Sequence, residues 1–215
     1  MREVWPYLIA GLALTILLAF AAHPAVAVAA GALTLGVASF FRDPHRDVRA
    51  DPAAILSPAD GRVVSIGPAA SGQPPGMRCV SIFLSVFNVH VNRSPVAGRI
   101  SGIEYTPGSF LPAYREKASE LNEQNLIALE TDRGPMAVKQ IAGLIARRIR
   151  CWKRPGDAVS QGEKIGFITF GSRVDLFIPP GAELRVRVGD RVRGGLTVMA
   201  AYKGAGGSEQ AGATP

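Results

Sequence analysis

A long apolar stretch occupies the start of the chain. No Asp, Glu, Lys or Arg occurs within Tyr7–Phe41, and its only strongly polar side chain is His23, which precedes Pro24. As one helix these 35 residues would be about 50 Å long, whereas the hydrocarbon core of a bilayer is about 30 Å thick. The pattern therefore predicts a hairpin of two short membrane helices, Tyr7–Ala22 and Ala25–Phe41.

A secretory signal peptide is the alternative interpretation of this stretch. The letters AAHPAVA are similar to a small-residue cleavage site. Signal peptides, however, have an apolar core of only about 7–15 residues, and here a second apolar run follows the first at once. We therefore expect the hairpin to be retained.

Beyond Ile55 the pattern of apolar and polar positions is that of a β protein. Val, Ile and Phe are concentrated in short runs separated by Gly and Pro. Strict alternation of apolar and polar residues over Leu184–Val188 is typical of a strand with one solvent-exposed face. The expected β segments are GRVVSIG (Gly61–Gly67), RCVSIFLSVFNVHVN (Arg78–Asn92), GPMAVKQIAGLIARRIRCW (Gly134–Trp152), EKIGFITF, RVDLFIP and ELRVRVGDRVRGGLTVMAAY.

Helical patterning outside the hairpin is confined to one segment, Pro112–Asn125, which has Pro near its start. The final letters, KGAGGSEQAGATP, are low in complexity and predict disorder. The chain is thus expected to divide into a hairpin with its juxtamembrane segment (1–50), a globular β domain (51–203) and a disordered tail (204–215).

Two stretches of the globular part echo each other. ILSPADGRVVSIG and KRPGDAVSQGEKIGFI both place Gly and Asp in a turn before a β run, and the second resembles half of a lipoyl- or biotinyl-type barrel-sandwich. We expect a mainly β fold with a minor α component: a compact β sandwich or barrel-sandwich-like catalytic domain behind an N-terminal hydrophobic helical hairpin. Such a fold does not by itself assign a function.

The distribution of charge suggests where the hairpin lies. The chain has 24 Lys and Arg against 17 Asp and Glu, a net charge of +7. Arg42, Arg46 and Arg49 follow the hairpin and Arg2 precedes it, which favours the cytoplasmic face of the cell membrane for both flanks. Nucleic acid is the competing partner for a basic chain, but no recognised binding motif occurs, so no nucleic acid is expected.

Cysteine usage agrees with a reducing compartment. Cys79 and Cys151 are the only cysteines in 215 residues, and two lone thiols in a chain of this length are typical of proteins without disulfides. No CxxC motif or Cys/His cluster is present. We therefore expect no metal site.

Three residues are candidates for chemistry. His90 is the only histidine outside the membrane-proximal region and lies at the end of an apolar run, before a polar loop. Asp60 lies in a SPADG turn, which explains it unless a partner such as His90 is near. Ser172 follows Gly171 between two strand-like runs, where a turn or bulge is the alternative. A conventional serine hydrolase is disfavoured because FGSRV lacks the GxSxG elbow.

Several motifs together resemble those of the phosphatidylserine decarboxylases, in the short archaeal-type form of that family. In order they cover most of the chain from Phe40 to Pro179, and their combination is far more specific than any one of them. The matching segments are FFRDPHR, SPADGRV, FLSVFNVHVNRSPVAG, NEQN, QIAGLIARRI and GDAVSQGEKIGFITFGSRVDLF.

The resemblance implies a pyruvoyl-dependent zymogen that cuts itself between Gly171 and Ser172. Ser172 would attack the Gly171 carbonyl, and elimination and hydrolysis would turn Ser172 into a pyruvoyl group, the cofactor. A β chain (1–171) and an α chain (172–215) would remain together as a heterodimer. The cofactor would form a Schiff base with phosphatidylserine in the membrane and serve as electron sink as CO2 leaves, producing phosphatidylethanolamine.

The resemblance also implies roles for two other residues. His90 would be the base and later the proton donor, and Asp60 would orient it. The longer bacterial form has a second histidine where this chain has Arg93, and Thr or Ser where it has Arg173. One histidine would therefore serve both self-cleavage and decarboxylation.

Two other functions stay open at this point. A non-catalytic, membrane-tethered barrel-sandwich carrier or adaptor would need a modifiable Lys at a hairpin tip, whereas Lys139 lies inside a β run. The same chemistry on an ether-linked serine lipid is the other alternative. Arg147, Arg148 and Arg150 would face either lipid phosphate or carboxylate, or form a solvated strand face.

Overall fold

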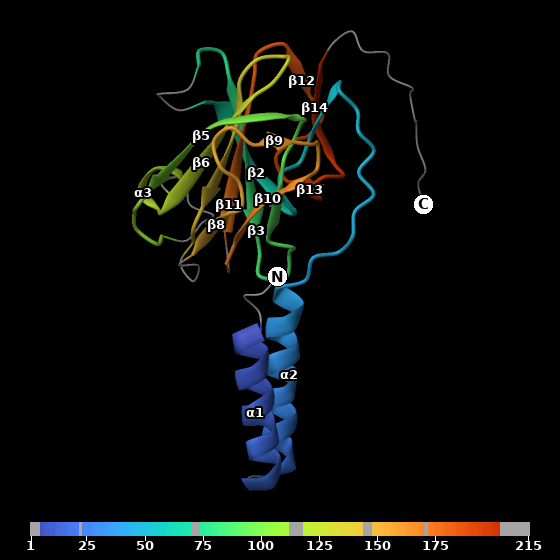
Figure 1. Ribbon diagram of the computed structural model, residues 1–215, viewed down its shortest axis with the longest axis vertical. Helices are drawn as coiled ribbons and strands as arrows, with labels where there is room; N and C mark the ends of the chain where they lie inside the picture. Colours follow the sequence, from blue (N-terminus) through green and yellow to red (C-terminus); the bar gives the residue numbers. More distant parts are fainter. Residues whose placement is uncertain are drawn as a thin grey trace.

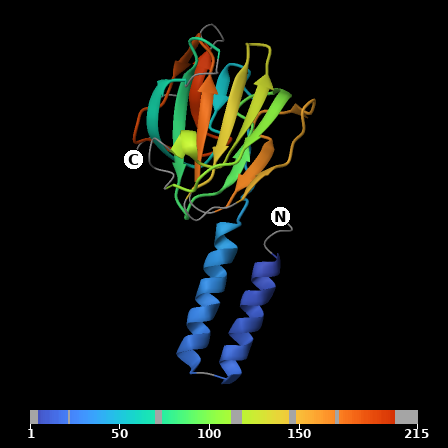
Figure 2. The same cartoon turned by 90° about the vertical axis from the view of Figure 1, so that its left-hand side faces the viewer.

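The fold consists of a helical pair below a β domain (Figures 1 and 2). A computed structural model describes residues 5–21, 23–69, 74–111, 118–143, 148–169 and 172–202. The predicted fold class, mainly β with an N-terminal helical hairpin, is confirmed.

Two helices form the hairpin, α1 (Trp5–Ala21) and α2 (Pro24–Phe40), with 17 residues each. His23 caps α2: its side chain accepts a hydrogen bond from a backbone N–H of the first turn. The helices approach closely at Gly11, where a side chain would collide with Thr34. Among the described residues, no helix combines the length and the apolarity needed to cross a membrane.

An eight-stranded sheet forms the centre of the β domain, with the strand order β13-β2-β3-β11-β7-β6-β5-β9. All of its neighbouring strands are antiparallel. Strand β11 is buried along its whole length between β3 and β7. The strands are β2 (Gly61–Pro68), β3 (Arg78–Leu84), β5 (Gly98–Thr106), β6 (Gln124–Glu130), β7 (Met136–Ile141), β9 (Ala158–Val159), β11 (Ser172–Ile178) and β13 (Arg191–Val192).

Two three-stranded sheets, β1-β14-β12 and β4-β10-β8, complete the domain. Residues from both of them and from the large sheet share one main hydrophobic core. The strands of the smaller sheets are β1 (Ala54–Leu56), β4 (Val91–Arg93), β8 (Ile149–Cys151), β10 (Lys164–Ile168), β12 (Ala182–Leu184) and β14 (Val198–Tyr202).

Side-chain alternation along β11 determines which way Ser172 faces. Val174, Leu176 and Ile178 belong to the main core, whereas Phe177 packs in a separate cluster on the opposite face. Because successive side chains of a strand point to opposite faces, Ser172 shares the face of Val174. The candidate nucleophile is therefore directed toward the core side of the sheet.

Two of the predicted strands are shorter than expected. Strand β3 ends at Leu84 and β4 begins at Val91, so the expected run Arg78–Asn92 is broken by a loop at 85–90. The alternating segment after Leu184 is not a strand, because a turn closes there: the Asp190 carboxylate accepts a hydrogen bond from the Arg187 N–H.

The helix expected over Pro112–Asn125 is found only as the short α3 (Ala118–Leu121). From Gln124 onward the chain is strand β6, because it pairs with both β5 and β7. Residues 112–117 of this expected helix and the expected disordered tail (204–215) lie outside the described residues. Cys79 and Cys151 are free thiols, as predicted.

Candidate active site

The expected cleavage position lies between two strands of different sheets. Strand β10 ends at Ile168 and β11 begins at Ser172, which pairs with Leu84 of β3. Gly171 lies outside the described residues. Thr169, just after β10, lines a pocket together with Tyr7 and Phe41, so β10 ends at the side of the domain that faces the helical pair.

Ser172 is completely buried, and its Oγ has no hydrogen-bond partner among the described residues. A buried hydroxyl left without a partner is destabilising by about 1–3 kcal/mol, so such groups are rare in native proteins. An unsatisfied, buried hydroxyl at this position is therefore a candidate for chemistry rather than for packing.

His90 has a defined hydrogen-bonding state. Its Nδ1 lies 2.9 Å from the backbone oxygen of Asn88. Because a carbonyl can only accept, Nδ1 carries the proton and Nε2 keeps its lone pair. Nε2 is buried and has no partner among the described residues. The ring also packs against Phe40, with the ring centroids 4.4 Å apart.

Burial sets the charge of this imidazole. Loss of solvation lowers the pKa of His90 to about 4, and the positive charge of Arg42 lowers it further, against the opposing effects of the Asn88 bond and of the Asp60 charge. At neutral pH the ring is therefore uncharged and able to accept a proton at Nε2.

Backbone pairing brings Ser172 and His90 to the same end of the domain. The N–H of Ile168 donates to the His90 carbonyl oxygen at 3.3 Å, and Leu84 pairs with Ser172. Leu84 is six positions before His90, and Ile168 is four positions before Ser172. The two pairings therefore hold Ser172 and His90 at the same end of the domain. Within the described part of the chain no hydrogen bond joins the two side chains, and each keeps one unsatisfied polar atom.

Asp60 is engaged elsewhere than expected. One carboxylate oxygen accepts from Arg46 at 2.8 Å and the other from the Gly194 N–H at 2.7 Å. Because Asn88 holds the Nδ1 of His90, the expected orienting bond from Asp60 to His90 is not among the described hydrogen bonds. Among the described residues, the effect of Asp60 on the imidazole is that of its charge, which raises the pKa of His90.

A row of buried amides near His90 was missed by the sequence reasoning. Gln140 donates to the side chain of Asn92 at 2.8 Å, and Asn125 donates to Gln140 at 3.0 Å. The side-chain nitrogen of Asn92 is buried without a partner among the described residues. Gly166 makes room for this row, since an added Cβ would meet Gln140 at 2.7 Å. The NEQN motif, which contains Asn125, was the one available signal.

A buried ion pair follows Ser172 on the other face of β11. Arg173 donates to Asp175 at 2.8 Å and to Ser81 at 2.5 Å, and Ser119 donates to Asp175 at 2.8 Å. Burial, followed by the nearby Asp175 charge, raises the pKa of Cys79 to about 12, so this thiol is not a nucleophile. These contacts fix the start of β11.

A basic pocket of about 270 Å³ lies between the helical pair and the β domain. It is lined by the start of α1, by Phe41, by Arg148 and Arg150, and by Thr169, which is three residues before Ser172. Arg147, the third arginine expected here, lies outside the described residues. Thr169 thus brings this pocket close in sequence to the expected cleavage position.

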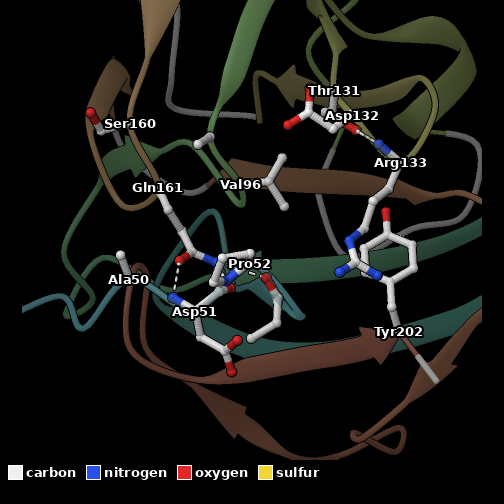
Figure 3. A pocket seen from close by; sticks show the side chains of 12 residues that line it. Ala50, Asp51, Pro52, Val96, Thr131, Asp132, Arg133, Ser160, Gln161 and Tyr202 are labelled. Atoms are coloured by element: carbon white, nitrogen blue, oxygen red, sulfur yellow. Dashed lines mark hydrogen bonds between the residues drawn. The ribbon is translucent and has the colours of Figure 1, made fainter. Parts of the chain in front are cut away.

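Another pocket, of about 370 Å³ (Figure 3), is lined by Arg133 and so lies at the end of the large sheet where β7 begins. Arg133 lies over the ring of Tyr202 there, 4.8 Å from its centroid. From this end β7 runs to Ile141, which pairs with Arg173 beside Ser172. The pocket is therefore separated from the candidate residues by the length of β7.

The position of Lys139 bears on the carrier alternative. Its Nζ donates to the Ser119 carbonyl oxygen at 3.0 Å, and the residue lies within β7. A carrier lysine must be exposed at a hairpin tip, so Lys139 does not meet that requirement.

Comparison with known proteins gives a consistent result. The family model described as phosphatidylserine decarboxylase matches residues 33–200. The chain is 43% identical over 203 residues to a phosphatidylserine decarboxylase proenzyme of Paraburkholderia phymatum, covering 93% of this chain and 95% of that protein. It is 47% identical over 194 residues to the proenzyme of Solibacter usitatus, covering 90% and 92%. None of these names specifies a subfamily, so the archaeal-type form stays a prediction.

Proposed function

The chain belongs to the phosphatidylserine decarboxylase family, and on this premise we propose that it is a proenzyme that cuts itself between Gly171 and Ser172 to make a pyruvoyl group. One observation supports this more than any other: Ser172 Oγ and His90 Nε2 are both buried at the same end of the domain and have no hydrogen-bond partner among the described residues. A hydroxyl and an uncharged imidazole are the pair that serine activation requires.

Self-cleavage begins when His90 Nε2 accepts the Ser172 hydroxyl proton. The Oγ attacks the carbonyl carbon of Gly171, the peptide C–N bond breaks, and an ester with a free Ser172 amine results. The unpartnered Asn92 side-chain nitrogen is a candidate donor to the oxygen that gains charge in this step.

Loss of the Ser172 α-proton then expels the Gly171 carboxylate, which ends the β chain (1–171). Water replaces the nitrogen of the remaining dehydroalanine, ammonia leaves, and the α chain (172–215) begins with a pyruvoyl group. When present, that group supplies a ketone that condenses with an amine and accepts the electrons released with CO2. Pairing of β10 with β4 and β8, and of β11 with β3 and β7, holds both new ends in place.

The same residues serve the reaction on phosphatidylserine. His90 returns a proton to the product carbon, which is the role of a general acid near the site. Asp60 is a positioning residue in this proposal: it ties Arg46 and Gly194 together and influences His90 by its charge. Arg148 and Arg150, in the basic pocket, suit the phosphate or carboxylate of the lipid headgroup.

The helical pair would attach the enzyme to the cytoplasmic face of the cell membrane. Large apolar side chains of both helices are exposed, including Phe20, which is 90% exposed, and Leu33. An exposed apolar surface of this kind indicates contact with lipid or protein. The basic residues Arg42 and Arg46 follow the pair, which favours a cytoplasmic flank.

Replacing the nucleophile tests the proposal. Ser172→Ala removes the only atom that can form the ester, so we expect a single uncut chain and no phosphatidylethanolamine. The intact mass and a decarboxylation assay on phosphatidylserine in detergent micelles measure both outcomes. In the unaltered protein the smaller fragment should begin at position 172 and lack a free amine.

Ser94→Ala is the matched control, because Ser94 is equally buried but donates to the Val96 carbonyl oxygen. This variant should still cut. Decarboxylation by uncut Ser172→Ala would show that the mechanism is wrong, as would an unaltered protein that stays uncut while active.

A further inference from the structure

A cleft of about 550 Å³ lies beside the loop 85–90, at the end of the domain that faces the helical pair. The loop is held there because Arg42, just after α2, donates to the Phe87 carbonyl oxygen. The cleft is lined by Asp60, Gly61, Arg62, Phe83, Ser85, Asn88, Arg191, Val192 and Arg193. We refer to Arg62, Arg191 and Arg193 as the arginine cleft.

The arginine cleft carries positive charge that no described carboxylate neutralises. Arg62 lies directly opposite Arg191 in the antiparallel pair of β2 and β13. Like charges in that arrangement are destabilising, by up to about 1 kcal/mol. Within the described part of the chain, no hydrogen bond or ion pair involves any of the three guanidinium groups. The one described carboxylate that lines the cleft, Asp60, is already bonded to Arg46 and Gly194.

An apolar loop tip lies next to these arginines. Phe87 is 81% exposed and Val86 is 40% exposed. Ser85 and Asn88, which flank them, line the arginine cleft. A bilayer surface has acyl chains beneath a layer of anionic phosphates. The exposed Phe87 ring would suit the acyl chains, and the neighbouring arginines would suit the phosphates.

We propose that the arginine cleft and the loop tip form a docking surface for anionic phospholipid. The guanidinium groups bind headgroup phosphates, and Phe87 enters the interface. This lipid is a ligand of the surface and is not consumed, so the proposal goes beyond the reaction. Docking would orient the β domain on the membrane, with the end that carries Ser172 and His90 held against the leaflet.

A fluorescent label at position 86 tests the docking surface and leaves Phe87 in place. Full-length protein with Cys79→Ser, Cys151→Ser and Val86→Cys, labelled with NBD, is reconstituted into phosphatidylcholine vesicles with increasing phosphatidylglycerol. We expect a blue shift of the emission as phosphatidylglycerol is added. In Arg62→Gln/Arg191→Gln/Arg193→Gln the shift should be lost over the same range of phosphatidylglycerol, because three arginines at about 1 kcal/mol each correspond to roughly hundredfold weaker binding.

Arg99→Gln/Arg133→Gln/Arg154→Gln is the matched control. It removes the same charge at the other end of the large sheet, where Arg99 pairs with Glu130, and should keep the response. Equal emission with and without phosphatidylglycerol, or an equal loss in both triple variants, would overturn the proposal. Because this readout does not depend on self-cleavage or decarboxylation, its failure is distinguishable from failure of the proposed function.

Discussion

At the scale of single residues, the site is marked by polar atoms that the fold leaves unsatisfied. Ser172 Oγ, His90 Nε2 and the side-chain nitrogen of Asn92 are buried without a partner among the described residues. Each such atom destabilises the folded chain, so three at one end of the domain indicate a place where a reacting group belongs. The Asn88 carbonyl keeps the proton on Nδ1 of His90, so the lone pair of Nε2 is available to accept a proton.

The lowered pKa of His90 predicts a pH dependence of stability. Folding lowers this pKa from 6.5 to about 4, so the unfolded chain binds the proton more tightly. The contribution of His90 is fully present above pH 6.5 and is lost as the pH falls toward 4, by about 3 kcal/mol in all. Urea unfolding between pH 7.5 and pH 4 measures this change in the free energy of unfolding. The Ser172→Ala background is used so that the protein stays a single uncut chain.

His90→Gln in the same background is the comparison. Gln does not titrate, so this variant should lose less stability over that pH range, whatever its stability at pH 7.5. Parallel curves for the two proteins would contradict a buried, uncharged His90.

At the scale of elements, strand β11 connects the proposed cleavage position to the rest of the sheet. It is buried throughout, and its second residue, Arg173, is paired with Asp175 two positions later. A buried ion pair is a weak source of net stability, but removing one partner leaves a buried charge without compensation. The pair therefore fixes where the strand starts, and with it the position of Ser172.

Substitutions in this pair should not be additive. Asp175→Leu removes the Asp175 carboxylate, one of the partners of the buried Arg173 guanidinium, and should lower the free energy of unfolding by up to about 3–5 kcal/mol. Arg173→Met/Asp175→Leu should recover most of that loss, because both charges are removed together. Urea unfolding in the Ser172→Ala background measures both variants. A double variant as unstable as Asp175→Leu would contradict the role of the pair.

At the scale of the whole molecule, the helical pair is part of the site. Phe40 and Phe41, at the end of α2, form one apolar cluster with Val89, Val91 and Phe167 of the β domain. Phe40 also covers the ring of His90. Docking of the helices thus supplies part of the burial that keeps this imidazole uncharged.

Removing the Phe40 ring should therefore change the chemistry of His90. In Phe40→Ala we expect the pKa of His90 to rise from about 4 toward 6.5, because water regains access to the ring. The large-to-small change should also lower the free energy of unfolding by about 3–5 kcal/mol. Histidine NMR titration in the Ser172→Ala background measures the pKa, with His90→Gln assigning the signal.

Leu33→Ala is the control for this variant. Leu33 also lies in α2 but is 71% exposed, so its loss should leave the His90 pKa unchanged. The same His90 pKa in Phe40→Ala and in the parent would show that the helices do not control the site.

The sequence by itself determined the features that depend on local pattern. The turn of the hairpin at His23 follows from one polar residue within an apolar stretch, and the β class follows from short runs of Val, Ile and Phe between Gly and Pro. The same local reading predicted an interruption at Gly171-Ser172-Arg173 between two strands; β10 and β11 are indeed separate strands, but Ser172 and Arg173 are the first residues of β11. These features require only neighbours in the chain.

Only the tertiary structure decided which distant groups meet. Among the described hydrogen bonds, His90 Nδ1 bonds to the Asn88 carbonyl rather than to Asp60, and the amides Asn92 and Gln140 form a row across sheets. Likewise, Arg62 lies opposite Arg191 although 129 positions separate them in the chain. Pairing of distant strands depends on register and packing over the whole domain, which no local pattern of apolar and polar residues specifies.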